Sequence, residues 1–241
     1  MVSPWDVHDL LIVGAGGFAR ETAQAVVAAN MRRPTWRLLG FLDDDPRKAG
    51  GRIDGLDVLG GCDLVHEYPH ARVVLCIGNP RDYFSRARMA RRLDLPKERY
   101  ATIVHPAAEV SSNSTIGPGS ILLAHCVLTA AVEVGAHVAV MPRVVMTHDD
   151  VLEDFVTVAS GVCLGGGTRV GRGAYVGAGA LVRESVTIGA WSLVGMGSVV
   201  LRDVPPEQVW IGNPARPLRP VAVPDDLAPA DRRDGVEREG T

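Results

Sequence analysis

An aliphatic residue recurs at every sixth position from Val104 to Val200, without a single slip. The positions are Val104, Val110, Ile116, Leu122, Leu128, Val134, Val140, Met146, Leu152, Val158, Leu164, Val170, Val176, Val182, Ile188, Val194 and Val200. A helix would need apolar residues about 3.6 positions apart, and a hairpin sheet would show a period of two. A period of six fits neither template. It predicts a parallel β-solenoid in which one aliphatic side chain per side points inward.

The residues around each inward position favour short strands joined by corners. The position two residues earlier is usually small or β-branched, as at Ser120 and Thr168, and the next position is often glycine, as at Gly135 and Gly171. β-Branched residues favour extended backbone, and glycine tolerates the geometry of a corner. Three six-residue units make one triangular coil, so the repeat predicts about five coils.

A different pattern precedes the repeat. Residues 10–13 are expected to form a buried strand, followed by a glycine-rich turn and a helix over about 20–30. Further strands are expected at 38–42, before the acidic turn of Asp43 and Asp44, and at 73–77, before Gly78 and Asn79. Strands that alternate with helices predict a small parallel α/β domain.

Three parts of the chain are therefore expected. Residues 1–100 form the α/β domain, with the character of a nucleotide- or nucleotide-sugar-binding unit, and residues 101–218 form the solenoid. Residues 219–241 are rich in Asp, Arg, Pro and Gly with little apolar content, which predicts a disordered tail.

Composition argues against several classes of protein. The net charge is -3, and no basic stripe interleaved with aromatics is found, so no nucleic-acid partner is expected. The apolar run at residues 10–13 is too short to span a bilayer and lacks the layout of a signal peptide, so no membrane association and a cytoplasmic location are expected. The four cysteines are scattered and predict neither a metal site nor a disulfide framework.

The glycine turn at Gly14, Gly16 and Gly17 joins the first strand to the first helix. Such a turn can bring backbone N–H groups and a helix N-terminus against a phosphate. The same residues also suit a tight turn with no ligand, so both interpretations stay open. A nicotinamide-dependent oxidoreductase is disfavoured, because only two or three βα units precede the solenoid and a full dinucleotide fold needs more.

An α/β domain followed by hexapeptide coils resembles the PglD/NeuD-type sugar O- and N-acetyltransferases, a family of hexapeptide-repeat acyltransferases. The most specific stretch of this resemblance is residues 146–155, where His148 is followed by Asp149. Residues 210–216 resemble the segment with which the family's solenoid ends. The resemblance implies a Rossmann-like α/β domain followed by a left-handed parallel β-helix. It also implies acetyl-CoA as cosubstrate without a metal, and a homotrimer with active sites between adjacent subunits.

Acetyl transfer needs a base, because the attacking amine or hydroxyl loses a proton, and histidine titrates near neutral pH. His148 comes two residues after an inward position, which predicts a place near a corner. The resemblance implies that Asp149 orients its ring and that Gly166, one coil later, holds the thioester carbonyl. A surface histidine and a strained glycine corner are the alternatives. His125 and His137 lack an acidic neighbour and are expected to be solvated.

The resemblance also implies contacts to the acceptor sugar and to acetyl-CoA. The acceptor contacts are Gly14, Gly16, Gly17, Phe18, Asp43, Asp44, Gly78 and Asn79. The glycines are assigned to phosphate and the aspartates to a base or ribose. Phe18 departs from a histidine common in members that modify amino sugars. Thr157, assigned with Gly166 to acetyl-CoA, replaces a second histidine and can donate one hydrogen bond without acting as a base.

The predicted function is an acetyl-CoA-dependent acetyltransferase that acts on an amine or hydroxyl of a sugar, with a nucleotide-linked sugar favoured. N- and O-acetylation both stay open. The alternatives are a non-catalytic nucleotide-binding scaffold and an acyltransferase for a secondary-metabolite acceptor.

Overall fold

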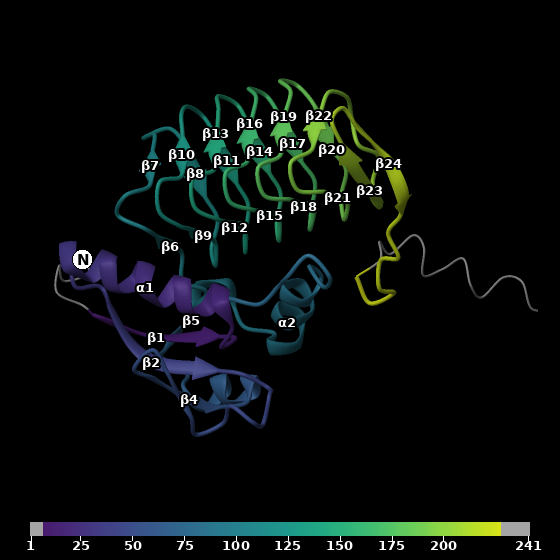
Figure 1. The fold of residues 1–241 in the computed structure, drawn as a ribbon. Helices are drawn as coiled ribbons and strands as arrows, with labels where there is room; N and C mark the ends of the chain where they lie inside the picture. The colour runs from purple at the N-terminus through teal and green to yellow at the C-terminus, as the bar shows by residue number, and fades with distance from the viewer. Residues whose placement is uncertain (1–6, 228–241) are drawn as a thin grey trace, which may run out of the picture.

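The computed structural model describes residues 7–227 and consists of an α/β domain that lies along one side of a long solenoid (Figure 1). The central sheet of the α/β domain has the order β3-β4-β2-β1-β5. Its strands are β1 (His8–Val13), β2 (Trp36–Leu42), β3 (Arg52–Ile53), β4 (Leu56–Gly60) and β5 (Arg72–Leu75). All neighbours are parallel except β3 and β4, which form an antiparallel hairpin that the sequence did not predict.

Four helical segments complete the α/β domain: α1 (Gly17–Arg32), η1 (Cys62–Glu67), α2 (Ser85–Leu93) and η2 (Lys97–Arg99). α1 begins three residues before its predicted start, directly after the glycine turn. Its inner face is lined by small residues and one valine, which lets the helix pack closely on the sheet. These residues are Ala19, Thr22, Ala23, Ala25 and Val26.

The solenoid consists of two-residue strands joined by four-residue corner turns. The strands are β6 (Ile103–Val104), β7 (Glu109–Val110), β8 (Thr115–Ile116), β9 (Ile121–Leu122), β10 (Val127–Leu128), β11 (Glu133–Val134), β12 (Ala139–Val140), β13 (Val145–Met146), β14 (Val151–Leu152), β15 (Thr157–Val158), β16 (Cys163–Leu164), β17 (Arg169–Val170), β18 (Tyr175–Val176), β19 (Leu181–Val182), β20 (Thr187–Ile188), β21 (Leu193–Val194) and β22 (Val199–Val200). The predicted inward residue is the second residue of every strand. Parallel pairing joins each residue to the one a full coil later, as Met146 pairs with Leu164.

The strands stack into three sheets, which form the faces of a triangular prism. We call them the β6 face (β6, β9, β12, β15, β18 and β21), the β7 face (β7, β10, β13, β16, β19 and β22) and the β8 face (β8, β11, β14, β17 and β20). The inward aliphatics from all three faces merge into one hydrophobic core. The predicted architecture, an α/β domain followed by a left-handed parallel β-helix, is confirmed.

The α/β domain packs on the β6 face. Residues of β1 and α1, such as Ile12 and Ala19, share a buried cluster with Ile103 and Ile121 of β6 and β9. The junction also encloses the side chain of Arg86 from α2, which is 3 % exposed. His137 is 7 % exposed at the same junction, so the prediction that it is solvated is wrong. The α/β domain covers this corner, which no local pattern at His137 indicates.

A hairpin of β23 (Gln208–Gly212) and β24 (Ala215–Pro220) ends the solenoid on the β6 face. The next residues return toward α2, where Val221, Val223 and Leu227 pack against a cluster that includes Phe84 and Trp191. Residues 219–227 therefore make defined contacts, so the prediction of disorder is wrong for this part of the chain. The remainder of that predicted tail, 228–241, lies outside the described residues.

Candidate active site

His148 lies on the corner turn between β13 and β14, on the edge where the β7 and β8 faces meet. Its Nδ1 atom is 2.8 Å from Oδ2 of Asp149. The two side chains are 68% and 69% exposed, so the pair is open to a ligand or to another molecule. Asp149 has a φ of 63°, a left-handed conformation that a non-glycine residue adopts only at some cost. The predicted pairing of the ring with this carboxylate is present in the structure.

Gly166 lies directly against the ring of His148, one coil later. A Cβ atom at position 166 would fall 2.5 Å from both Cε1 and Nε2 of His148. The two turns are joined by the N–H of Gly167, which donates to the carbonyl oxygen of His148 at 2.8 Å. The N–H of Gly166 itself has no hydrogen-bond partner within residues 7–227. A histidine nitrogen and an unpaired backbone donor are therefore neighbours at this edge.

A cavity of about 380 Å³ lies at the carboxyl ends of β1, β2 and β5. Its lining includes every predicted acceptor contact, namely Gly14, Gly16, Gly17, Phe18, Asp43, Asp44, Gly78 and Asn79. Parallel strands end at one edge of the sheet, which explains why turns far apart in the sequence meet there. Lys48 also lines this cavity and was not predicted. Its ammonium group forms an ion pair with the carboxylate of Asp43 at 2.8 Å, beside the glycine turn.

The glycines of this turn meet different surroundings. Gly14 has a φ of 101°, and a Cβ there would lie 2.7 Å from the backbone oxygen of Cys76, so the fold itself requires glycine. A Cβ at Gly16 or Gly17 would meet no atom within 4 Å. The N–H groups of Gly16, Gly17 and Phe18 have no acceptor among the described residues. Unpaired donors at the start of a helix suit an anionic group.

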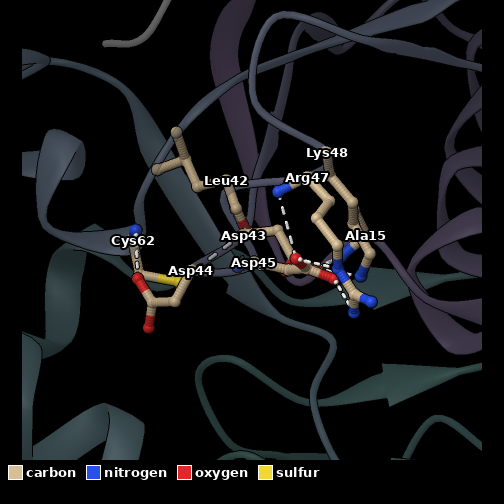
Figure 2. Close-up of polar contacts among 8 residues, drawn as sticks. All are labelled: Ala15, Leu42, Asp43, Asp44, Asp45, Arg47, Lys48 and Cys62. Atoms are coloured by element: carbon tan, nitrogen blue, oxygen red, sulfur yellow. Dashed lines mark hydrogen bonds and ion pairs between the residues drawn. The ribbon is translucent and has the colours of Figure 1, made fainter.

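Asp43 supports this turn from the next strand (Figure 2). Its Oδ2 accepts hydrogen bonds from Ala15 N and Lys48 Nζ, both at 2.8 Å, and its Oδ1 accepts one from Asp45 N at 2.9 Å. Partial burial raises the pKa of Asp43, but these hydrogen bonds outweigh it and leave the pKa below its ordinary value. The carboxylate therefore stays charged at neutral pH and holds both the turn and Lys48 in place.

Asp44 is also engaged within the chain. Its Oδ1 accepts a hydrogen bond from Cys62 N at 2.9 Å, and its Oδ2 accepts one from Arg92 at 2.6 Å. The hydrogen bond from Arg92 lowers the pKa of Asp44. Both aspartates thus order the cavity wall through internal contacts, in addition to lining the cavity.

Thr157 lies on β15 of the β6 face, where its Oγ1 accepts a hydrogen bond from Arg86 at 2.8 Å. It lines a cavity of about 290 Å³ together with Phe18, Gly78 and Asn79. The β6 face is opposite the edge that carries His148. Within one chain the structure therefore forms two groups of predicted site residues, one around His148 and one around the glycine turn, and Thr157 belongs with the second.

Comparison with known proteins shows which proteins share these features. Residues 9–93 match the PglD N-terminal domain. The chain is 33% identical over 123 residues to UDP-N-acetylbacillosamine N-acetyltransferase of Bacillus subtilis, covering 49% of this chain and 52% of that protein. It is 36% identical over 126 residues to mitochondrial serine acetyltransferase 3 of Arabidopsis thaliana, covering 50% and 27%. The chain thus spans about half or less of the length of these curated relatives.

Two solved structures are similar over nearly the whole described chain. The acetyltransferase domain of PglB from Neisseria gonorrhoeae, in complex with acetyl coenzyme A, has a TM-score of 0.78 at 28% identity and covers 88% of this chain and 100% of that one. PerB from Caulobacter crescentus, in complex with CoA and GDP-perosamine, has a TM-score of 0.77 at 27% identity and covers 89% and 99%. Residues 9–93 thus match the N-terminal domain of the PglD-type proteins, and the whole described chain is similar in fold to acetyltransferase structures of that type.

Two further observations concern metal sites and membrane-spanning helices. No group of three or more His, Cys, Asp or Glu side chains that could hold a metal ion occurs between residues 7 and 227. Over the same residues, no helix has the length and apolar character needed to cross a bilayer.

Sequence reasoning missed three residues at these sites. Lys48 belongs to no motif, and Arg86 lies in a helix with four arginines, a pattern typical of a solvent-exposed helix. Asp150 follows the predicted pair directly and occupies a repeat position that is small or β-branched elsewhere. This break in the pattern was the one available signal.

Proposed function

We propose that this protein transfers the acetyl group of acetyl-CoA to an amine or hydroxyl of a nucleotide-linked sugar. The observation that carries the proposal is the His148–Asp149 pair beside the unpaired N–H of Gly166, on an edge of a hexapeptide solenoid. Support comes from PglB, solved with acetyl coenzyme A, and PerB, solved with CoA and GDP-perosamine. In this proposal residues 1–100 select the acceptor and residues 101–218 carry out transfer.

The arrangement suits general base catalysis. Nε2 of His148 accepts the proton of the acceptor nitrogen or oxygen as that atom bonds to the thioester carbonyl carbon. The carbon–sulfur bond breaks, CoA leaves as the thiolate, and His148 returns the proton to the sulfur. Asp149 accepts a hydrogen bond from Nδ1–H and stabilises the charged ring. A positioned base contributes about 10² to 10⁴ in rate.

Gly166 is assigned to the developing oxyanion. Its N–H is unpaired within the described chain and stands next to the base, where the carbonyl oxygen of the thioester would lie. A backbone donor of this kind contributes roughly 10² to 10³ in rate. The absence of a side chain at this position also leaves the space that the imidazole occupies.

The cavity beside the glycine turn is assigned to the nucleotide part of the acceptor. The unpaired N–H groups of Gly16, Gly17 and Phe18 suit the diphosphate, and the Lys48 ammonium, which is paired with Asp43, lies in the same cavity wall. Asp43, Asp44, Gly78 and Asn79 are assigned to the walls that hold the base and ribose. Because Phe18 and Thr157 have no basic nitrogen, neither side chain can assist His148 in removing the acceptor proton.

A homotrimer is proposed for the active form. His148 lies on the edge opposite the β6 face, whereas the glycine turn and Thr157 lie on the side of that face. One chain therefore does not bring base and acceptor cavity together, but a neighbouring copy could complete the site with its own α/β domain. Acetyl-CoA would then bind between adjacent solenoids, in reach of Gly166 of one copy and Thr157 of the next. A cytoplasmic location also stays a prediction.

The test is release of CoA from acetyl-CoA, measured with a thiol reagent and a panel of nucleotide-linked amino and hydroxy sugars. His148→Ala is expected to lower kcat about 10² to 10⁴-fold. His125→Ala is the matched control, because His125 is an exposed histidine on another solenoid corner, and it should retain wild-type turnover. Unchanged turnover in His148→Ala would remove His148 from the mechanism. No binding of acetyl-CoA at millimolar concentration in calorimetry would favour the scaffold.

A further inference from the structure

Asp150 occupies a repeat position with a defined structural task. At four other places this position holds serine, and the serine Oγ accepts a hydrogen bond from a backbone N–H of the next coil at 2.9 to 3.2 Å. The pairs are Ser114 with Val132, Ser120 with Val138, Ser192 with Gln208, and Ser198 with Gly212. Asp150 does the same, since its Oδ1 accepts a hydrogen bond from Thr168 N at 2.8 Å.

The second oxygen of Asp150 makes a contact that a serine could not add. Oδ2 accepts a hydrogen bond from the N–H of Thr147 at 2.8 Å, and Thr147 directly precedes His148. The Thr147 hydroxyl in turn donates to the carbonyl oxygen of Leu164 at 3.0 Å. One carboxylate therefore ties the turn that carries His148 to the turn that carries Gly166.

The carboxylate is buried without a cation. Asp150 is 0% exposed, and its oxygens accept hydrogen bonds only from neutral backbone groups among the described residues. The turns above and below, residues 129–132 and 165–168, contain no titratable side chain, so the titratable groups near Asp150 are His148 and Asp149 of its own turn. Burial raises the pKa of Asp150 to about 6.

A buried charge of this kind lowers stability at neutral pH, because the folded state must desolvate it. Elsewhere in this solenoid, serine accepts the same hydrogen bond from the next coil without that cost. What distinguishes Asp150 is the second bond, to the residue before His148. Groups that lower stability next to a reactive side chain are typical of functional sites.

We propose that Asp150 is a positioning residue that holds the His148 turn and the Gly166 turn in register for acetyl transfer. The proposal rests on the function proposed above. Asp150 contacts neither reacting group and acts through the backbone of Thr147 and Thr168.

The test compares Asp150→Ser with wild type. Serine keeps the bond to Thr168 N–H and loses the bond to Thr147 N–H. Amide hydrogen exchange of Thr147 is expected to become at least about tenfold faster, while that of Thr168 stays protected. kcat is expected to fall about tenfold or more, with KM for acetyl-CoA within about twofold, because His148 is misplaced rather than removed. The melting temperature at pH 8 should not decrease.

Ser120→Ala is the matched control. It removes the same kind of coil-to-coil bond at a distant corner, so it should lower the melting temperature and leave kcat unchanged. Wild-type exchange at Thr147 together with wild-type kcat in Asp150→Ser would overturn the proposal. So would a lower melting temperature with kcat unchanged, which would make Asp150 a structural residue like Ser120.

Failure of the proposed function is distinguishable from failure of this proposal. If the wild type releases no CoA with any acceptor, the acetyltransferase assignment fails. The exchange rate of Thr147 and the NMR titration of the His148 ring still decide whether Asp150 holds the turn. A His148 titration that is identical in wild type and Asp150→Ser, with unchanged Thr147 exchange, would then refute it.

Discussion

The Nε atom of Arg86 donates a hydrogen bond to the backbone oxygen of His137 at 2.8 Å, which fixes α2 to a corner of the solenoid. The same guanidinium donates to the carbonyl oxygens of Phe155 and Val156 and to Thr157 Oγ1. It also reaches the carbonyl oxygen of Ile77, directly before Gly78, at 3.3 Å. Burial lowers the pKa of Arg86 to about 10, so it remains charged at neutral pH.

Replacement of Arg86 with methionine should strongly destabilise the junction. The variant leaves several buried carbonyl oxygens without a donor, at a combined cost of about 3 kcal/mol or more in the free energy of unfolding. Urea denaturation checks this. Arg88→Met is the control from the same helix, since Arg88 is partly exposed and pairs with Asp82, and its loss should cost under about 1 kcal/mol. Equal effects of the two substitutions would contradict the assignment of Arg86 to the junction.

Gly166→Ala should impair catalysis by displacing the base. Its Cβ would lie 2.5 Å from Nε2 of His148, so the ring must move. We expect kcat to fall about 10- to 100-fold. A double-mutant cycle tests the cause: in the His148→Ala background the same substitution should have little further effect, because its target is gone. A full additional loss would indicate that Gly166 acts independently of His148, through its N–H alone.

Gly16→Ala should weaken acceptor binding without unfolding the α/β domain. A Cβ at Gly16 meets no protein atom, so it would intrude only on a ligand that approaches the turn. We expect KM for the nucleotide-linked sugar to rise about tenfold, with the melting temperature nearly unchanged.

Gly14→Ala provides the contrast within the same turn. Its Cβ would lie 2.7 Å from the carbonyl oxygen of Cys76, and φ is 101° there. Stability should fall by about 2 kcal/mol or more. If Gly16→Ala instead destabilised the protein as much as Gly14→Ala does, the glycine turn would be explained by geometry without a ligand.

The buried ring of His137 should make stability pH-dependent. Burial lowers the pKa of His137 to about 4, with Arg86 adding to the shift. Between the ordinary histidine pKa, about 6.5, and pH 4, the unfolded chain binds a proton that the folded chain does not, so stability falls as pH falls. Between pH 7 and pH 4, the free energy of unfolding of the wild type should fall by about 3 kcal/mol relative to that of His137→Phe. Urea denaturation at several pH values measures the difference, and parallel curves would contradict it.

Asp150 should make stability depend on pH with the opposite sign over the same pH range. Because its pKa is raised to about 6, the folded chain binds a proton between pH 6 and pH 4 that the unfolded chain does not. Stability of wild type should therefore rise relative to Asp150→Ser as pH falls, by about 3 kcal/mol. The two groups offset each other in wild type, so both variants are needed to resolve them. If the wild type instead lost stability relative to Asp150→Ser as the pH falls, the carboxylate would not be buried as described.

The solenoid could be predicted because its determinants are local and repeated. Each inward aliphatic, such as Met146, packs on its equivalent one coil away, Leu164, so one rule acts once per side of every coil. The same six-residue spacing predicts the corner positions of His148 and Asp149, and it places Gly166 one coil after His148. The glycine turn could be predicted for a similar reason, since the carboxyl ends of neighbouring parallel strands meet at one edge.

The tertiary structure alone decided what lies between the two domains. Arg86 belongs to a short, strongly basic helix, and His137 has only small and apolar neighbours at a corner, so each looks solvated in isolation. Both are buried because the α/β domain covers the β6 face, and this packing depends on contacts between residues far apart in the chain. The period of six therefore determined the prism and the residues on its edges. Packing of the α/β domain determined which face is covered, and hence that His148 and the glycine turn lie on opposite sides of one chain.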